Sequence, residues 1–227
     1  MLLNPLTQPG DFFLPKITTL DQPFALHDPS FAKPSPGSSA KSPSTCGCIG
    51  PQPEGRPVFD SLLQEYHYLG YTGAVGQNVQ YLVRDRPGRD LACVLFGAAA
   101  WQTRARDVFI GWTAAQREAG LHLVANNSRF LILPWGRVPE LASPILGRVA
   151  RRIAADWQWR YGQRVALLET FVERGRFRGS CYRAANWTCA GQTQGRTRQD
   201  RRHVLQVPVM DVWVYPLQAD FRRVLCQ

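Results

Sequence analysis

The fold class of this protein follows from residues 128–173, SRFLILPWGRVPELASPILGRVARRIAADWQWRYGQRVALLETFVE. The apolar runs SRFLILPW and VALLETFV predict buried strands. Between them runs the longest predicted helix, for which Ser143 is a good N-cap and Pro144 occupies the first helical position. A strand, a helix and a second strand in this order are typical of an α/β fold. Apolar side chains recur along one face of the helix, at Ile145, Leu146, Val149, Ile153 and Trp157.

Shorter predicted elements on either side extend this pattern. They are a helix over residues 57–70, a hairpin formed by 79–83 and 91–101, a helix over 113–120 with Thr113 as its cap, a short helix over 179–191 and a last strand over 212–217. Because strands and helices alternate after an initial hairpin, we predict an α/β fold in which a mixed sheet has flanking helices.

The first 57 residues differ in composition from the rest of the chain. They contain 11 of the 17 prolines, and their Pro/Ser/Gly-rich stretch has almost no apolar periodicity. Such a segment cannot bury enough apolar surface to offset the entropy that is lost on ordering. We therefore predict a disordered or extended leader over residues 1–57, followed by one α/β domain over residues 58–227.

The composition argues against several classes of protein. No apolar run approaches the roughly 18 to 20 residues of a membrane helix, and no basic segment precedes an apolar block as in a signal peptide. We therefore predict a cytoplasmic protein with no membrane partner. The six cysteines are too scattered for a disulfide framework. Cys46 and Cys48 could be half of a zinc site or part of a flexible turn; no second pair of ligands follows them, so we expect no metal.

Positive charge is concentrated late in the predicted domain. The chain has a net charge of +10, and the segment from Arg174 to Arg202 holds eight arginines and a single acidic residue, Asp200. Clustered arginines attract polyanions and can bind phosphate through paired hydrogen bonds, so we predict nucleic acid as a partner. The alternative is that the arginines reflect genomic base composition and are spread over a solvated face. The predicted contacts are Arg174, Arg176, Arg178, Arg183, Arg196, Arg198, Arg201 and Arg202.

A candidate catalytic group lies where the second buried strand ends. Alternation along that strand places Glu169 on one face with apolar Leu167 and Phe171. A carboxylate in such surroundings is costly, so Glu169 either pairs with an arginine of the following loop or acts as a base with a raised pKa. Tyr182 and Asn186 are four residues apart and would share one face of the predicted helix. We hypothesise that Glu169, Tyr182 and Asn186 line one pocket as catalytic residues.

Further polar and aromatic side chains are candidates for binding a ligand. Two asparagines and an arginine precede the first buried strand; the amides could orient a ligand or could simply turn the chain. The candidate ligand-binding residues are Asn126, Asn127, Arg129, Arg137 and Trp187.

The remaining polar positions have alternative structural roles. His67 lies among aromatic residues and could act as a base or form a structural hydrogen bond. Asp107 is flanked by arginines and predicts an ion pair, and Trp112 is expected to pack in the core.

A family resemblance emerges from strings that occur together and in this order: YHYLGY, RDVFIGW, NNSRFLILPW, LASPIL, DWQWRYG, LLETFVE, GSCYRAANW and GQTQGR. They resemble the DruA-like family, which takes its name from a protein of the Druantia anti-phage defence system. Similar domains also occur together with transposase domains in insertion elements. The resemblance runs from about residue 58 to 217 and covers nearly all of the predicted domain.

The family's order of strands and helices is in turn similar to the acyltransferase-like fold of the GNAT superfamily. In that fold the fourth strand is followed by a long helix whose N-terminus holds the pyrophosphate of coenzyme A. The usual phosphate loop is missing here, and Pro139 and Pro144 each lack an N–H that could have met phosphate. Coenzyme A binding is therefore doubtful, although Arg137 beside the helix N-terminus could hold another anion.

The resemblance and the charge together favour a protein of a defence or mobile-element locus that engages nucleic acid, with a helicase or transposase encoded nearby as a possible partner. The alternative is a GNAT-like enzyme that acts on a nucleobase or small molecule, by acyl transfer, at the pocket of Glu169, Tyr182 and Asn186. A third reading is an inactive remnant of an insertion element.

Overall fold

The computed structural model describes residues 48–49, 56–136, 138–195 and 207–227. The predicted leader lies almost entirely outside these residues, so the domain boundary near residue 58 stays a prediction. Five of the predicted site residues lie outside them as well: Arg137, Arg196, Arg198, Arg201 and Arg202.

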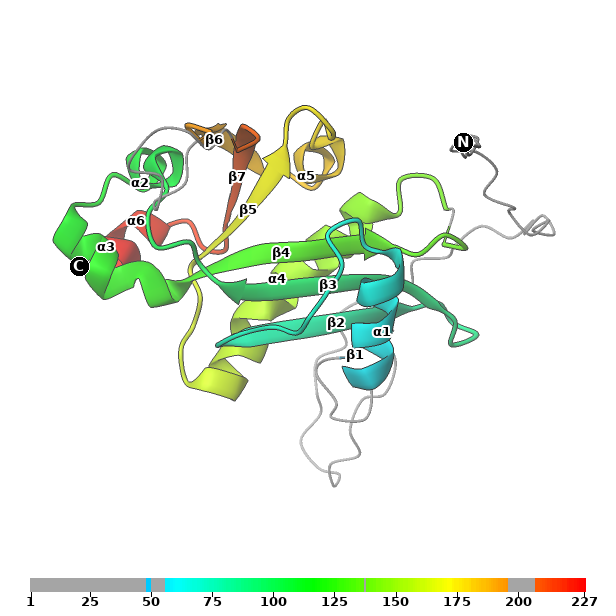
Figure 1. Ribbon diagram of the computed structural model, residues 1–227. Coiled ribbons are helices and arrows are strands. Elements are labelled where there is room, and N and C mark those ends of the chain that lie inside the picture. The colour runs from blue at the N-terminus through cyan, green and yellow to red at the C-terminus, as the bar shows by residue number, and fades with distance from the viewer. Residues whose placement is uncertain (1–47, 50–55, 137, 196–206) are drawn as a thin grey trace, which may run out of the picture. The chain divides into compact units, whose positions relative to one another are not determined.

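A seven-stranded sheet with the strand order β1-β2-β3-β4-β5-β7-β6 forms the centre of the described fold (Figure 1). Neighbouring strands are antiparallel except β4 and β5, which are parallel. The prediction of a mixed α/β sheet is confirmed. The strands are β1 (Cys48–Ile49), β2 (Asn78–Arg84), β3 (Asp90–Ala98), β4 (Val124–Ile132), β5 (Leu167–Glu173), β6 (Thr188–Gln192) and β7 (Met210–Pro216).

Helices flank this sheet, as predicted, and they lie on both of its faces. In Figure 1, α1 lies in front of β2 and β3, and α4, which connects β4 to β5, lies behind them. The helices are α1 (Arg56–Tyr66), α2 (Arg104–Ile110), α3 (Ala114–Gly120), α4 (Ala142–Tyr161), α5 (Ser180–Ala184) and α6 (Phe221–Leu225), and a short 3-10 helix, η2 (Leu121–Leu123), follows α3.

Burial on both faces explains the apolar character of the hairpin formed by β2 and β3. Along β2, Val79, Tyr81 and Val83 pack in the core that contains α4, whereas Leu82 packs against Phe59 on the α1 side. Successive side chains of a strand point to opposite faces, so a strand covered by helices on both sides has an almost continuous apolar sequence.

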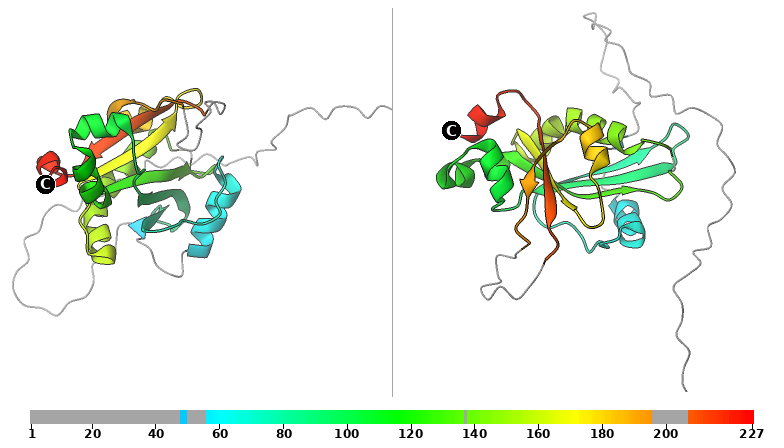
Figure 2. Two further views of the ribbon diagram at one scale, coloured as in Figure 1. Left: turned by 60° about the vertical axis from the view of Figure 1, so that its left-hand side comes forward. Right: turned by 90° about the horizontal axis from the view of Figure 1, so that it is seen from above.

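The parallel strands β4 and β5 are paired along only part of their length. Their register runs from Val124 opposite Leu167 to Asn126 opposite Glu169, and then the pairing stops. Beyond that point β4 remains paired with β3, and β5 with β7. The two strands diverge in Figure 1, and from above in Figure 2, β6 and β7 run across the direction of β2 and β3. The sheet is therefore split into two parts that share a short seam.

Two predicted helix boundaries differ from the structure. The helix α4 begins at Ala142, one residue before the predicted cap Ser143, and its N-cap position is Leu141, which makes no side-chain capping bond. The predicted helix over residues 179–191 ends at Ala184 because Asn186 adopts a left-handed conformation with φ of 62°. The strand β6 follows and pairs with β7.

Other local expectations are confirmed, and two short helices were missed. Thr113 caps α3 in a reciprocal capping box with Gln116, as the sequence predicted. The helices α2 and α6 were not predicted, because five to seven residues show too little of a 3.6-residue period. Both lie against the part of the sheet formed by β5 and β7, where Ile110, Phe221 and Leu225 pack together.

Candidate nucleic-acid interface

Glu169 forms a buried ion pair with Arg106 of α2. Its Oε2 accepts a hydrogen bond from Nη1 of Arg106 at 3.0 Å, and its Oε1 accepts one from the backbone N–H of Ala100 at 2.8 Å. Both charged side chains are 0% exposed. Burial raises the pKa of the Glu169 carboxyl, and the positive charge of Arg106 opposes that rise. Glu169 therefore takes the paired alternative, with an arginine of α2 in place of one from the loop that follows it.

Arg106 also takes part in a wider polar network around Asp107. The ion pair that the sequence predicted for Asp107 is present in this network. Arg106 donates to Oδ1 of Asp107 from Nε at 3.0 Å and from Nη2 at 2.8 Å. The indole N–H of the buried Trp112 donates to the same oxygen at 3.1 Å, and Arg117 donates to the other oxygen at 3.4 Å. These bonds fix α2 against the sheet, which is a structural role.

Tyr182 lies on the opposite face of the sheet from Glu169. Its hydroxyl donates to Oδ1 of Asn127 at 2.8 Å, and its ring packs in the core that contains α4. Along β5, Leu168 contributes to that core, whereas Leu167, which shares its face with Glu169, contributes to the core of α2 and α6. The expectation that Glu169 and Tyr182 line one pocket is therefore wrong. The alternation predicted along β5 was correct, but α5, the helix that follows this strand, packs on the opposite face of the sheet from Glu169.

Asn186 does not share the face of Tyr182 either. It follows the end of α5, is exposed to solvent, and has the left-handed φ given above. The backbone N–H of Trp187 donates to the carbonyl oxygen of Tyr182, which closes the turn after the helix. The expected spacing of four residues along one helix face does not apply, because the helix has already ended. Without this pocket, the acyl-transfer alternative loses the geometry on which it was based.

Two of the five candidate ligand residues, Asn127 and Arg129, form hydrogen bonds within the fold. The Asn127 amide donates to the carbonyl oxygens of Leu95 and Arg129, each at 3.0 Å. Arg129 donates to the carbonyl oxygens of Gly70 and of its neighbour in the chain, and Trp187 is buried in the core beside Tyr182. Asn126 is half-buried, and its amide oxygen has no hydrogen-bond partner within the described part of the chain. A role of these residues in binding a ligand stays a prediction.

The segment before the N-terminus of α4 is held against the sheet. The indole N–H of Trp135 donates to the carbonyl oxygen of Asp90 at 2.6 Å. A Cβ added at Gly136 would lie 2.9 Å from the carbonyl oxygen of Leu91. The chain approaches β3 so closely here that this position requires glycine. These contacts position the start of the helix, beside which Arg137 was expected to hold an anion.

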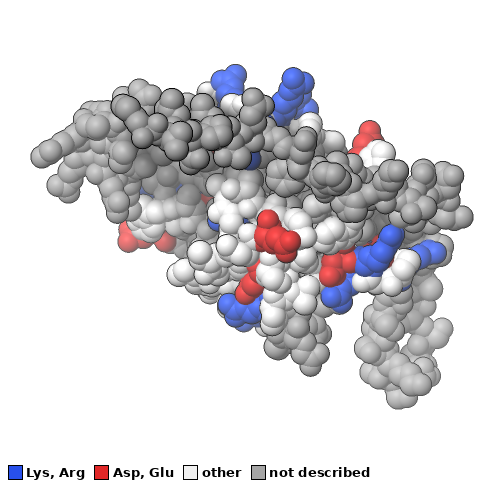
Figure 3. Space-filling model, turned by 45° about the vertical axis from the view of Figure 1, so that its right-hand side comes forward, with Lys and Arg blue, Asp and Glu red and all other residues white. Residues whose placement is uncertain are grey.

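The described arginines of the predicted basic face lie together on one exposed segment. Arg174, Arg176 and Arg178 belong to the loop between β5 and α5, Arg183 lies in α5, and all four side chains are exposed. No carboxylate lies within ion-pair distance of any of the four among the described residues. Figure 3 shows one face of the molecule, with basic side chains projecting from its upper edge and both signs of charge lower down.

A glycine fixes the start of α5 and thereby the position of Arg183. Gly179 has a left-handed φ of 63°, and a Cβ added to it would lie 2.8 Å from the indole ring of Trp213. The left-handed φ favours glycine, and the contact with Trp213 leaves no room for a Cβ at this position. The guanidinium of Arg183 then lies 5.8 Å from the centre of the same Trp213 ring.

Exposed aromatic side chains border this arginine segment. Tyr68, just after α1, lies 5.2 Å from Phe177 of the loop between β5 and α5, measured between ring centres. Arg176 lies 4.1 Å from the centre of the Tyr68 ring. On the same tyrosine, His67 stacks at 4.9 Å with an angle of 28° between the rings. The surface formed by Arg176, Tyr68 and Phe177 is called the Arg176 platform below.

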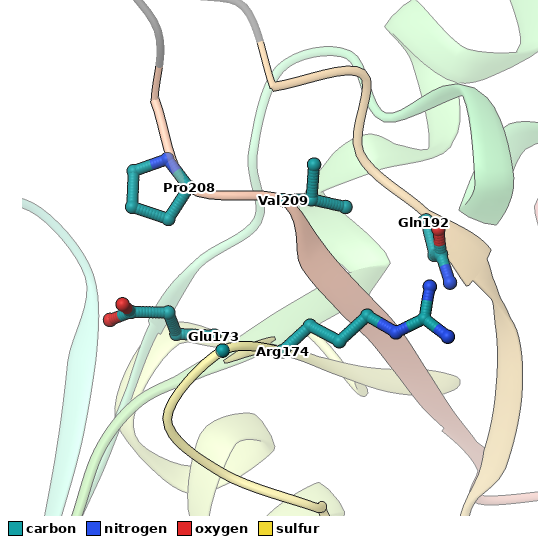
Figure 4. A pocket seen from close by; sticks show the side chains of 6 residues that line it. Glu173, Arg174, Gln192, Pro208 and Val209 are labelled. Atoms are coloured by element: carbon teal, nitrogen blue, oxygen red, sulfur yellow. The ribbon is translucent and has the colours of Figure 1, made fainter.

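A shallow pocket lies at one end of the arginine segment. It has a volume of about 480 Å³ and is lined by Glu173, Arg174, Gly175, Gln192, Pro208 and Val209. In Figure 4 the Arg174 side chain extends toward Gln192, whereas Glu173 points away from it. The backbone N–H of Arg174 donates to the carbonyl oxygen of Val209. The chain ends on either side of residues 196–206, which include four of the predicted arginines, therefore lie close to Arg174.

The pKa of His67 leads to a testable pH dependence. Burial and the nearby charges of Arg129 and Arg176 lower the pKa of its imidazole from 6.5 to about 4. Between these values the unfolded chain binds a proton that the folded chain does not. The free energy of unfolding should therefore rise with pH across this window and level off above it.

Urea denaturation at constant ionic strength would measure this effect against a His67→Asn variant. The backbone N–H of Leu69 donates a hydrogen bond to Nδ1 of His67 at 3.3 Å. Asparagine at this position keeps a side-chain oxygen that can accept the same hydrogen bond. The difference in unfolding free energy between wild type and variant should grow as the pH rises through the window. Parallel pH profiles would show that His67 does not carry this dependence.

Sequence reasoning missed two residues that organise this region. Arg106 was seen only as a neighbour of Asp107, although its position four residues before Ile110 in an apolar segment suggested that it faces the core. Tyr68 belongs to the string YHYLGY, whose dense aromatic content indicated a packed or stacking surface. Its contact with Arg176 joins segments more than a hundred residues apart, which no local pattern could reveal.

Two general classes of feature are missing from the described ranges. No helix in them is both long and apolar enough to cross a lipid bilayer. Within the same ranges, no three His, Cys, Asp or Glu residues are grouped so that they could hold a metal ion.

Comparison with solved structures finds acetyltransferases at low sequence identity. Spermidine/spermine N-acetyltransferase SpeG from Vibrio cholerae, crystallised with manganese ions, is 8% identical, and the match covers 78% of this chain and 95% of that one with a TM-score of 0.47. The spermidine N-acetyltransferase from Vibrio cholerae in complex with CoA and spermine gives a TM-score of 0.46 at 8% identity, over 74% of this chain and 91% of that one. None of the curated proteins matches the chain.

Comparison with protein families gives a match over most of the chain. The model of the family described as Druantia protein DruA matches residues 44–206. The matched range contains β2 to β6 and the whole segment of four exposed arginines. The family resemblance inferred from the eight strings is thereby confirmed, and the chain belongs to the DruA family.

Proposed function

We propose that this Druantia-type protein binds nucleic acid through the segment from Arg174 to Arg183, within an anti-phage defence or mobile-element locus. The observation that carries this proposal is the group of four exposed arginines with no carboxylate partner among the described residues. A guanidinium that is not already paired can bind a phosphate through two parallel hydrogen bonds.

The contrast with other arginines of the chain supports this assignment. Arg84, Arg89, Arg106 and Arg152 each form an ion pair with an aspartate or glutamate at 2.6 to 3.0 Å. The positive charge of these four arginines is largely neutralised within the fold. The positive charge of the segment from Arg174 to Arg183 has no carboxylate partner among the described residues, so it remains available to an anionic partner.

The described ends of the connection between β6 and β7 lie beside Arg174. The backbone N–H of Arg174 donates a hydrogen bond to the carbonyl oxygen of Val209. Gly195 lies close to Val207, because a Cβ added to Gly195 would lie 3.1 Å from the carbonyl oxygen of Val207. The segment 196–206 starts and ends at these neighbouring residues, and it contains four further arginines of the predicted interface. A polyanion bound at Arg174 would therefore lie near the ends of a second arginine-rich segment.

Binding of this kind should depend strongly on salt. Each phosphate that an arginine neutralises releases condensed counterions, which gives a slope of about −0.9 per contact in log K against log salt for duplex DNA. Four contacts predict a slope of about −3.6, and a loss of affinity of roughly 100-fold between about 50 and 200 mM salt. Fluorescence anisotropy with a labelled oligonucleotide would measure the slope. An affinity that stays constant over this range would contradict the proposal.

A further inference from the structure

We infer that the Arg176 platform stacks on unpaired bases, so that this protein binds single-stranded nucleic acid in preference to duplex. The inference rests on the proposed function, because it assigns a substrate class to the same segment. The Arg176 platform is the place where the exposed charge and the exposed aromatic rings of this segment meet.

The rings hold Arg176 in a defined place. Its guanidinium lies 4.1 Å from the centre of the Tyr68 ring and 5.5 Å from the centre of the Phe177 ring. Contact with two rings restricts a side chain that would otherwise move freely in solvent. A guanidinium plane that is fixed in this way can stack on a base and still carry its charge.

The platform is supported from the protein side and open toward solvent. His67 is only 8% exposed and stacks on Tyr68, and its Nδ1 accepts a hydrogen bond from the backbone of Leu69. In contrast, Tyr68 is 43% exposed and Phe177 is 41% exposed. Exposed rings of this kind contribute to stability less than buried ones, but they provide contact area for a ligand.

Unpaired bases fit this surface better than a duplex does. In a duplex the faces of the bases are covered by their neighbours, so a ring or a guanidinium can stack only on a base that is unstacked. Stacking on aromatic side chains tolerates any sequence because every base has a π-face. Arg174 and Arg178 lie two residues before and after Arg176 in the same exposed loop, where they can contact the phosphates of the strand.

A matched pair of arginine variants separates stacking from charge. Arg176→Lys keeps the positive charge but loses the planar group, whereas Arg178→Lys makes the same exchange at an exposed arginine that has no aromatic contact among the described residues. The probes are a deoxythymidine oligomer, a uridine oligomer, a duplex and an abasic oligomer that has phosphates without bases, all of the same length. Thermal melting of both variants checks that they are folded.

The wild type should bind the base-containing single strands roughly 5-fold to 100-fold more tightly than the abasic strand, as expected for stacking of one base or a few. Arg176→Lys should lose most of this difference, and Arg178→Lys should keep it. A second variant, Phe177→Leu, keeps an apolar side chain without a ring and should reduce the same difference. The thymidine and uridine probes distinguish DNA from RNA as the source of the strand.

The possible failures are distinguishable. If no probe binds, the proposed function itself is wrong. If all probes bind but the wild type does not distinguish strands with bases from the abasic strand, the protein contacts phosphates alone and the inference is overturned. The same conclusion follows if Arg176→Lys and Arg178→Lys have equal effects, since Arg176 would then act through its charge only.

Discussion

Replacing Arg174, Arg176, Arg178 and Arg183 together by glutamine should weaken the binding of nucleic acid by roughly 100-fold at about 50 mM salt and flatten its salt dependence. With four arginine charges removed, the slope of log K against log salt for duplex DNA should fall in magnitude by up to about 3.6. The four side chains are exposed and form no ion pair in the described structure, so the free energy of unfolding should change by no more than about 0.5 kcal/mol per site.

A control with the same loss of charge shows whether position matters. Four other exposed arginines that form no ion pair among the described residues can be replaced by glutamine: Arg86, Arg151, Arg160 and Arg164. Fluorescence anisotropy on both proteins then compares a local loss of charge with a general one. If the two sets weaken binding equally, net charge is sufficient and the segment from Arg174 to Arg183 is not the interface.

Replacing Arg106 by methionine should destabilise the protein by about 3 to 5 kcal/mol, because it leaves a buried carboxylate without its partner. Glu169 is 0% exposed and would keep only the backbone N–H of Ala100 as a donor. Urea denaturation would measure the loss at neutral pH. The loss should shrink at lower pH, because without Arg106 the pKa of the buried Glu169 carboxyl rises further, and protonation then removes the uncompensated charge.

A second change in the same protein tests the cause. Glu169→Gln in the Arg106→Met background removes the charge and keeps an oxygen that can accept from Ala100, so it should recover much of the lost stability. The exposed pair of Arg223 and Asp220 gives a control, because breaking a surface ion pair costs about 1 kcal/mol or less. If Arg106→Met were as stable as the wild type, the pair would not hold α2 in place.

The sequence was sufficient for the class of the fold and for several local features. Strand–helix–strand alternation around residues 128–173 led to the mixed sheet and its long helix, and alternation along β5 correctly placed Glu169 with Leu167. The cost of a buried carboxylate then required a partner. That partner could not be identified, since Arg106 is 63 residues away in the chain and lies in a short helix without a clear period.

The failure of the catalytic pocket has two physical causes. A residue in the left-handed conformation ended α5 early, and Asn tolerates that conformation far better than most residues. The helix α5 also packs on the face of the sheet opposite Glu169, where Asn127, beside a bulge in β4, accepts a hydrogen bond from the Tyr182 hydroxyl. Neither a single left-handed residue nor a bulge changes the apolar pattern from which strands and helices were predicted.

Because β4 and β5 are paired only over a short seam, the Arg176 platform also forms a contact between the two parts of the sheet. Tyr68 follows the helix that packs on β2 and β3, whereas Arg176 and Phe177 follow β5, so their contact spans both parts of the divided sheet. A strand of nucleic acid lying across these residues would clamp the two halves of the molecule together at the side where main-chain pairing is missing. A bound strand would therefore add an external cross-link between the two parts of the sheet, beyond the three residue pairs that join β4 and β5.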